Sequence, residues 1–342
     1  MTSGPAPVRD LTRLPKAHLH VHLESAVREA TATDLAHWYG RPLPAPASTF
    51  AGFAAFAANN ALIRDCLRDP ADFHRIAVEF CADEAAQGTR YAEVTFTAAS
   101  HGERLGTAEA PLEAVLAGLA EGGRAYGIAC RVILDHPRRR PVARAEQTLR
   151  LARRYAADGV VAIGLAGHEG HPVAPFAGVC AAARDAGVRL VHHAGETCGP
   201  ASIREALEVG LADRIGHGIR ALDDPGLVAE LRDRGIALEV CPSSNVALGL
   251  AASWAAHPLP RLAAAGLRVT LNTDVPASVG TTLTREYALA RDTFGYDDES
   301  LAALARTAVD ASFAPAALAD RLRHEITEWL DTPSAAIPME RP

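Results

Sequence analysis

Lysine is almost absent from this chain of 342 residues, in which Lys16 is the sole example. Schiff-base chemistry, pyridoxal phosphate attachment and a phosphate-binding loop each depend on a lysine in the site. A two-metal centre bridged by a modified lysine needs one as well. Lys16 stands at the start of the first predicted strand, which is the wrong end for an active site in a barrel. The scarcity of lysine therefore argues against several kinds of barrel active site together.

Cysteines and long apolar runs are also scarce. The six cysteines are scattered and form no CxxC pair, so a reduced cytoplasmic protein is favoured over a disulfide-stabilised one. No apolar stretch is long enough to span a membrane, and residues 1–16 lack the apolar core of a signal peptide. A formal net charge of −7 with interspersed arginines argues against a nucleic-acid surface. We interpret the short run Arg138–Arg140 as a solvated loop.

Apolar runs typical of strands alternate with helical stretches along the chain. Eight strands are predicted, at residues 17–23, 91–97, 129–134, 160–165, 189–193, 213–217, 236–240 and 268–272. Eight βα units in this length predict a (β/α)8 TIM barrel in a single domain over residues 1–342. A doubly wound open sheet is the alternative, but no Gly-rich nucleotide fingerprint follows the first strand. The capping-box spacing of Ser202 and Glu205 predicts the start of a helix after the fifth strand.

The connection after the first strand, about residues 24–90, is far longer than a simple loop and helix. It contains Phe53 and Phe56 in an Ala-rich stretch, and a helix is predicted over Asp72–Ala86. Long insertions at barrel loops commonly form lids. Phe53 and Phe56 are therefore expected either to cover a substrate or to pack in the core, and the sequence leaves both interpretations open.

Histidines and an aspartate lie at the ends of the predicted strands. His20 and His22 end the first strand, His193 the fifth and His217 the sixth, and Asp274 follows the eighth. Barrel active sites form at the C-terminal ends of the strands, so these side chains are expected to meet. Residues two apart in a strand share a face, so His20 and His22 can bind one ion. Three imidazoles and one carboxylate suit Zn²⁺, which lowers the pKa of a bound water to about 7.

Glu196 supplies an acid for the same site. It follows His193 across a small Ala-Gly turn and can face the attacking nucleophile. A protonated Glu196 could deliver a proton to a ring nitrogen, while His217 and Asp274 deprotonate or orient the water. An acid and a base on opposite sides of the reacting centre are what hydrolytic deamination requires. The sequence therefore predicts an enzyme with one Zn²⁺ per subunit and a small-molecule substrate.

Five segments resemble the adenosine deaminase family of metal-dependent aminohydrolases, namely PKAHLHVHL at 15–23, HAGE at 193–196, RIGHG at 214–218, LEVCPSSN at 238–245 and LNTD at 271–274. The resemblance implies zinc held by His20, His22, His193 and Asp274. It implies Glu196 as the proton donor to purine N1 and His217 as the residue that activates water. It also implies that the backbone of Gly167 contacts the purine and that Glu239 orients His217.

The chain departs from the family pattern where substrate recognition is expected. Val275 stands where a second aspartate usually bonds purine N7, and Glu24 stands where a shorter aspartate binds the nucleoside 5′-hydroxyl. The substrate is predicted to be a 6-aminopurine nucleoside, either adenosine or a 5′-modified analogue such as 6-aminodeoxyfutalosine of menaquinone synthesis. A deaminase of a free base or of a non-purine amine, and a non-catalytic binding relative, are the alternatives.

Three residues near the predicted site carry no settled role. His18 is expected to share the inward face of the first strand with His20, deeper in the barrel. His168 stands where the family has an aspartate, and it is expected in a loop or at the substrate rim. Thr95 occupies a position on the second strand that is often arginine, and nothing in the sequence explains it. The sequence does not predict the oligomeric state.

Overall fold

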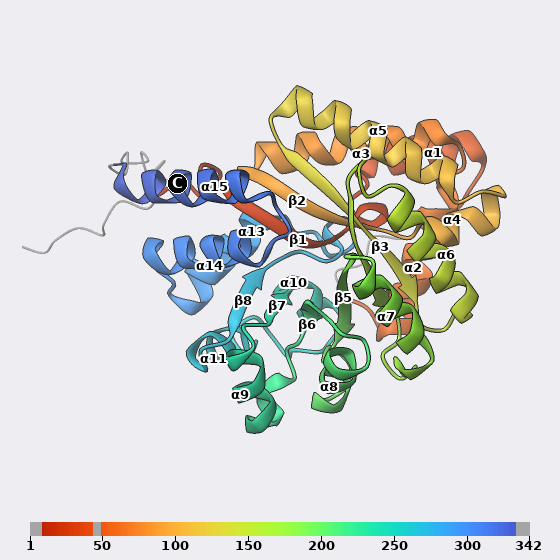
Figure 1. Cartoon of the computed structure of the whole chain (residues 1–342). Helices are drawn as coiled ribbons and strands as arrows, with labels where there is room; N and C mark the ends of the chain where they lie inside the picture. The colour runs from red at the N-terminus through yellow and green to blue at the C-terminus, as the bar shows by residue number, and fades with distance from the viewer. Residues whose placement is uncertain (1–8, 44–48, 333–342) are drawn as a thin grey trace, which may run out of the picture.

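The computed structural model describes residues 9–43 and 49–332. The signal-peptide prediction concerned residues 1–16, of which residues 1–8 lie outside the described ranges. Figure 1 shows the strands arranged as a barrel with helices on the outside. The strands are β1 Lys16–His22, β2 Thr89–Phe96, β3 Ala129–Pro137, β4 Val160–Ala166, β5 Arg189–Ala194, β6 Arg214–His217, β7 Ala237–Val240 and β8 Arg268–Leu271. No helix in the described ranges is long and apolar enough to cross a membrane.

The helices fall mainly between consecutive strands and after the last one. They are α1 Glu29–Tyr39, α2 Phe53–Cys66, α3 Pro70–Ala86, α4 Ala98–Leu105, α5 Glu109–Tyr126, α6 Val142–Arg154, α7 Ala177–Asp185, α8 Pro200–Glu208, α9 Pro225–Asp233, α10 Pro242–Ala247, α11 Leu259–Ala264, α12 Pro276–Val279, α13 Leu283–Phe294, α14 Asp298–Ala311 and α15 Ala316–Asp331, with short 3-10 turns η1 Leu23–Ser25, η2 Ala174–Phe176 and η3 Ala221–Asp223. In its described residues, 23–43 and 49–88, the connection between β1 and β2 thus contains η1 and three helices.

The strands pair in chain order from β1 to β8, each parallel to the next. The ends of β8 and β1 meet through a few bonds. Asp274 N donates to His20 O at 2.9 Å, and His22 N donates to Asp274 O at 2.8 Å. Asn272 Oδ1 accepts from both Leu19 N and His20 N, at 2.9 and 3.0 Å. The predicted (β/α)8 barrel is confirmed, and its closure joins the two strand ends that carry predicted metal ligands.

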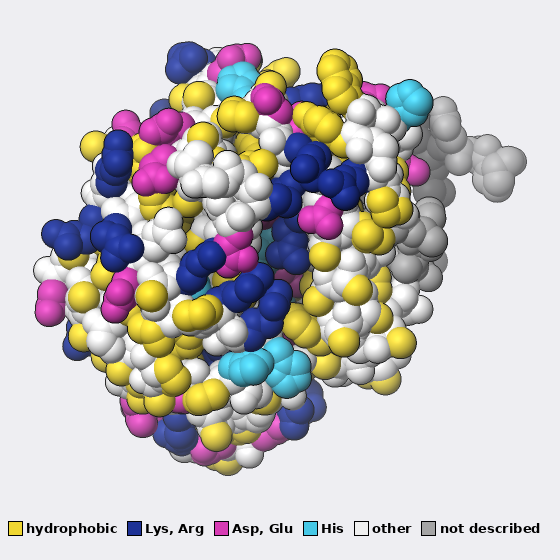
Figure 2. All heavy atoms as spheres, turned by 90° about the vertical axis from the view of Figure 1, so that its right-hand side faces the viewer, with side chains coloured by type: hydrophobic (Ala, Val, Ile, Leu, Met, Phe, Trp, Pro, Cys, Tyr) yellow, Lys and Arg dark blue, Asp and Glu magenta, His cyan; other side chains and the backbone are white. Residues whose placement is uncertain are grey.

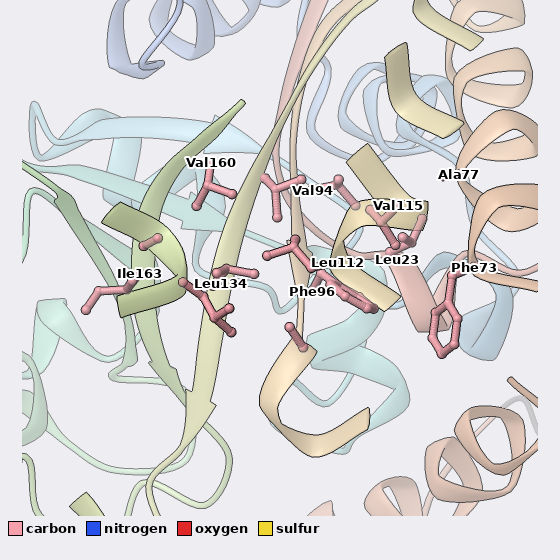
Figure 3. Packing of buried hydrophobic residues seen from close by; sticks show 14 of the residues in the cluster. Leu23, Phe73, Ala77, Val94, Phe96, Leu112, Val115, Leu134, Val160 and Ile163 are labelled. Atoms are coloured by element: carbon pink, nitrogen blue, oxygen red, sulfur yellow. The ribbon is translucent and has the colours of Figure 1, made fainter. Parts of the chain in front are cut away.

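Apolar side chains hold the helices against the barrel wall. Val94 and Phe96 lie two residues apart on one face of β2, and Leu112 and Val115 share one face of α5 (Figure 3). Phe73 of α3 completes this part of the core, and all five side chains are fully buried. Each such burial contributes about 1.5–3 kcal/mol. This packing fixes the long connection after β1 on the barrel.

Two helix starts show where local signals succeed and fail. Asp69 accepts from Ala71 N at 2.9 Å and donates its own N–H to Asp72 at 2.8 Å, so the predicted helix begins at Pro70. The capping-box prediction at Ser202 and Glu205 is wrong. Helix α8 already begins at Pro200, and the two side chains bond other segments.

The face of β1 changes where its pairing register shifts, between His18 and Val21. The prediction that His18 shares the inward face with His20 is therefore wrong. His18 Nδ1 lies 3.0 Å from Glu84 Oε2 on the outer helix α3. The sole lysine is structural at this end of the barrel: Lys16 Nζ donates at 2.5–2.7 Å to the backbone carbonyls of Leu11, Leu14 and Gln87.

Candidate active site

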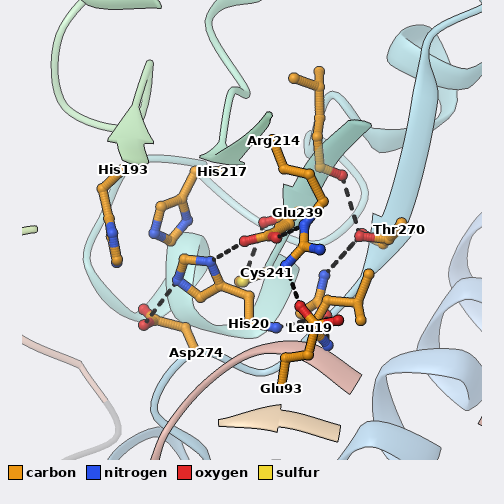
Figure 4. Close-up of polar contacts among 12 residues, drawn as sticks. Leu19, His20, Glu93, His193, Arg214, His217, Glu239, Cys241, Thr270 and Asp274 are labelled. Atoms are coloured by element: carbon orange, nitrogen blue, oxygen red, sulfur yellow. Dashed lines mark hydrogen bonds and ion pairs between the residues drawn. The ribbon is translucent and has the colours of Figure 1, made fainter. Parts of the chain in front are cut away.

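Imidazoles from β1 and β5 converge on Asp274 at the C-terminal end of the barrel. Figure 4 shows His20, His193 and Asp274 pointing toward one another. His22 Nε2 lies 3.3 Å from Asp274 Oδ1 and 3.3 Å from His193 Nε2. His20 Nε2 lies 3.6 Å from Asp274 Oδ1. The structure thus brings together the four side chains predicted to bind a metal.

His217 joins the same cluster. His20, His193, His217 and Asp274 each offer one ligand atom, and these atoms lie within 4.8 Å of one another. His217 and Asp274 both have left-handed backbone conformations, with φ of 66° and 61°, which side-chain-bearing residues seldom adopt. No sequence pattern signalled this backbone strain. It aims both side chains at the centre of the site.

The cluster has the properties of a metal site. His20 Nδ1 lies 2.8 Å from Glu239 Oε2, while its buried Nε2 has no hydrogen-bond partner among the described residues. An imidazole that is hydrogen-bonded to a carboxylate at one nitrogen and makes no hydrogen bond at the other is arranged as a metal ligand. Burial, reinforced by the neighbouring histidines, lowers the pKa of His193 well below its ordinary value. The neutral imidazole of His193 is the form that binds zinc. At His20, burial is outweighed by the interactions with the carboxylates of Asp274 and Glu239, which raise its pKa to about 10, so zinc must displace a proton from His20 when it binds.

A buried ion chain supports His20 from within the barrel (Figure 4). Arg214 Nε donates to Glu239 Oε1 at 2.6 Å, and Arg214 Nη2 donates to Glu93 Oε2 at 2.5 Å. The prediction that Glu239 orients His217 is wrong. Arg214 holds one oxygen of Glu239, and the other oxygen then faces His20.

Residues of α10, which follows β7, contact His217 and Asp274 instead. Ser244 Oγ donates to Asp274 Oδ2 at 2.7 Å. Asn245 Nδ2 lies 3.4 Å from His217 Nδ1. Both belong to the LEVCPSSN segment, so the family resemblance located them without indicating their contacts.

The turn that carries Glu196 is held by Glu169, a residue that the sequence analysis did not single out. The Glu169 carboxylate accepts from the backbone N–H groups of Gly195, Glu196 and Thr197, each at 2.8 Å. It also accepts from Ser202 Oγ at 2.7 Å. A carboxylate has about four lone pairs that can accept hydrogen bonds, so the four donors fully engage this group. Glu169 therefore fixes the backbone from which Glu196 projects.

The electrostatics around Glu196 favour its protonated form. Its Oε1 lies 3.7 Å from His217 Nε2. Burial raises the pKa of Glu196 well above its ordinary value, and the charges of Asp274 and Glu169 raise it further. A carboxyl group kept neutral in this way can donate a proton.

Arg138 differs from its predicted place in a solvated loop. Its side chain is only 4% exposed. It donates to the backbone carbonyl of His193, and to those of Glu169 and His171 at 3.4 and 3.3 Å. β3 continues to Pro137, so Arg138 starts beside the site rather than in a distant loop. This arginine ties β3 to the strand that carries His193.

An open pocket lies above the cluster. The predicted substrate-binding residues all line it, namely Glu24, Phe53, Phe56, Gly167 and Val275. Phe56 also packs with Val275, so the packing expectation is confirmed for this residue, and its covering of a substrate stays a prediction. His168 lies at the pocket, with its ring centroid 6.1 Å from that of Phe53. Buried Thr95 keeps no assigned role.

The pocket residue Glu24 is held from behind by a buried histidine that the sequence analysis missed. Glu24 Oε1 accepts from Thr97 N at 3.1 Å and lies 3.0 Å from His101 Nε2. Arg64 and Arg139 line the same pocket. Figure 2 shows basic side chains around a hollow on one face of the molecule. They are arginines, because the sole lysine, Lys16, is buried.

Comparisons with known proteins agree with this geometry. The model of the family described as adenosine deaminase matches residues 15–329. An aminodeoxyfutalosine deaminase of Streptomyces avermitilis is 37% identical, over 92% of this chain and 91% of that protein. An adenine deaminase of Rhizobium johnstonii is 36% identical, over 88% and 95%. The crystal structure of an amidohydrolase from Burkholderia ambifaria with bound Zn has a TM-score of 0.84 at 25% identity, over 96% and 98%.

These comparisons show a hydrolase of C–N bonds that deaminates an adenine-type substrate. The chain belongs to the adenosine deaminase family.

Proposed function

We propose that the protein catalyses the zinc-dependent, hydrolytic deamination of a 6-aminopurine nucleoside to its 6-oxo product and ammonia. The substrate is adenosine or a 5′-modified analogue such as 6-aminodeoxyfutalosine. One observation carries the proposal: Glu196, a carboxyl group with a raised pKa, lies 3.7 Å from His217 and lines one pocket with the metal-site residues.

His20, His22, His193 and Asp274 would hold one Zn²⁺ in each subunit. Zinc bound there supplies a Lewis acid that lowers the pKa of water and so provides a nucleophile at neutral pH. The free Nε2 of His20 and the lowered pKa of His193 support this assignment.

The chain's own residues would move the protons. Burial lowers the pKa of His217 to about 4, so His217 is neutral at pH 7 and can take a proton from the attacking water. Glu196 gives its proton to purine N1 as the C6–O bond forms. The proton on His217 then passes to the amino group, the C6–N bond breaks, and ammonia leaves. The hydroxyl proton at C6 returns to Glu196, which restores the site.

Free adenine is the second candidate substrate. Val275 cannot donate a hydrogen bond to N7, which removes one contact of the expected nucleoside pattern. The relative from Rhizobium johnstonii is an adenine deaminase.

The six cysteines are unpaired, which supports a cytoplasmic location as part of the proposal.

Ammonia release from a substrate panel tests the proposal. Zinc-loaded protein is assayed with adenosine, 6-aminodeoxyfutalosine, adenine and cytidine, and chelated protein serves as the control. We expect turnover of at least one of the two nucleosides above that of adenine, and loss of turnover after chelation. Activity on adenine alone would favour the free base, and activity on cytidine alone would reject a purine substrate.

A further inference from the structure

Asp135 is a pocket residue with no part in the proton transfers. It lies near the end of β3, paired with Gly164 of β4. It lines the same pocket as Glu24 and Thr97. Ile133, two residues earlier on the same face, belongs to a small buried apolar cluster. Asp135 therefore follows that apolar layer at the C-terminal end of the barrel, where the pocket opens.

One oxygen of the Asp135 carboxylate is buried without a partner. The side chain is 5% exposed, and Oδ1 is the one buried carboxylate oxygen that lacks a hydrogen bond within the described part of the chain. The neighbouring acid differs, because Glu24 is bonded to His101 and Thr97. An unpaired buried acceptor destabilises the protein because it has lost its hydrogen bonds to water. A donor on a bound ligand would offset that loss.

The charges around Asp135 are consistent with a ligand that donates hydrogen bonds. Burial raises the pKa of Asp135, and the nearby negative charge of Glu24 adds to this rise, while His22 opposes it. Arg64 lowers the pKa of both acids, so it limits their repulsion. Asp135, Glu24 and Arg64 all line one pocket, which thus holds two carboxylates and an arginine.

We propose that Asp135, together with Glu24, binds sugar hydroxyl groups and so selects a nucleoside over the free base. This inference rests on the proposed deamination and names the part of the substrate that the pocket recognises. Two acceptor side chains near each other match the several hydroxyl donors of a ribose. A free 6-aminopurine offers only its amino group, which must face Glu196 and His217, and one ring N–H.

The test compares Asp135→Asn and Asp135→Ala with the wild-type protein, all loaded with zinc. Asp158→Asn is the matched control, because Asp158 is exposed in the connection before β4. Turnover is measured with adenosine and adenine. Binding of purine riboside and purine, which have no amino group to release, is measured by calorimetry. Melting temperatures show that each variant is folded.

We expect the KM for adenosine and the dissociation constant for purine riboside to rise about 10–100-fold in both Asp135 variants, the range set by one lost buried hydrogen bond. The kcat for adenosine, the kinetics with adenine, and purine binding should stay within about threefold, as should every constant of Asp158→Asn.

The outcomes separate this inference from the proposed function. If the wild-type protein deaminates adenosine while the Asp135 variants bind purine riboside as tightly as it does, the inference is wrong and the deamination stands. If no adenosine is deaminated but the variants lose riboside binding alone, the deamination falls and the inference stands. Equal losses with base and nucleoside, or wild-type preference for purine over purine riboside, also overturn the inference.

Discussion

Replacing Glu169 by glutamine should reduce turnover without removing zinc. Oε1 of Glu169 accepts from the N–H groups of Glu196 and Thr197, and Oε2 accepts from Gly195 N and Ser202 Oγ. Glutamine has one acceptor oxygen and one NH₂ group, so at least one backbone N–H must face another donor. The best orientation keeps the Oε1 contacts and leaves Gly195 N unpaired, while the Ser202 hydroxyl can turn to accept.

The expected magnitude follows from that one orphaned donor. A buried unsatisfied N–H costs about 1–3 kcal/mol, and the remaining bonds lose the strength that the charge gave them. If the turn at residues 195–197 shifts so that its unpaired N–H finds another acceptor, Glu196 is displaced with it. If the cost appears in the transition state, kcat falls about 10–100-fold.

The assay is ammonia release at saturating substrate, with zinc measured by elemental analysis. Glu205→Gln is the matched control, because Glu205 uses only Oε1 to accept from Val173 N and Ala174 N, which a glutamine oxygen can replace. A kcat for Glu169→Gln within about twofold of the wild type would refute the positioning role, as would an equal loss in Glu205→Gln.

Three further predictions concern the metal site and stability. A Cβ on Gly216 would lie 2.7 Å from the His20 ring, so Gly216→Ala should lower the zinc content of the protein. Gly178→Ala is the control, because a Cβ there would meet nothing within 4 Å. Equal zinc content in the two variants would contradict this prediction. Lys16→Met should lower the free energy of unfolding in urea, by about 1–3 kcal/mol for each carbonyl left unpaired, and an unchanged midpoint would contradict it. Burial raises the pKa of Glu286 to about 7, so the folded chain keeps a proton that the unfolded chain releases above about pH 4.3. The free energy of unfolding should then fall by up to about 3 kcal/mol as pH rises from about 4 to 7, and Glu286→Gln should flatten this dependence in urea titrations at each pH.

The sequence predicts the barrel and the metal cluster because both depend on short-range pattern. Apolar runs mark the strands, and parallel strands of a barrel place their C-terminal ends together. His20, His193 and Asp274 could be found in this way, since each lies at or just past a strand end. Their convergence needed no knowledge of any long-range contact.

The errors and omissions arise from contacts between neighbouring strands. Asn272 accepts from two successive N–H groups of β1, and the register shift there turns His18 outward. Glu169 lies on the connection after β4 and bonds a turn after β5, so no local spacing reveals it. Asp135 was missed because the Asp-His-Pro sequence ends the apolar run at residue 134, whereas pairing with β4 extends β3 to Pro137.

Zinc content and turnover of Glu196→Gln test the proposed chemistry most directly. The amide keeps the shape of Glu196 but cannot deliver the proton, so we predict zinc at the wild-type level and a loss of kcat of about 10²–10⁴-fold. His193→Ala provides the contrast, because it should lose zinc. A Glu196→Gln protein that holds zinc and turns over at a near-normal rate would contradict the account.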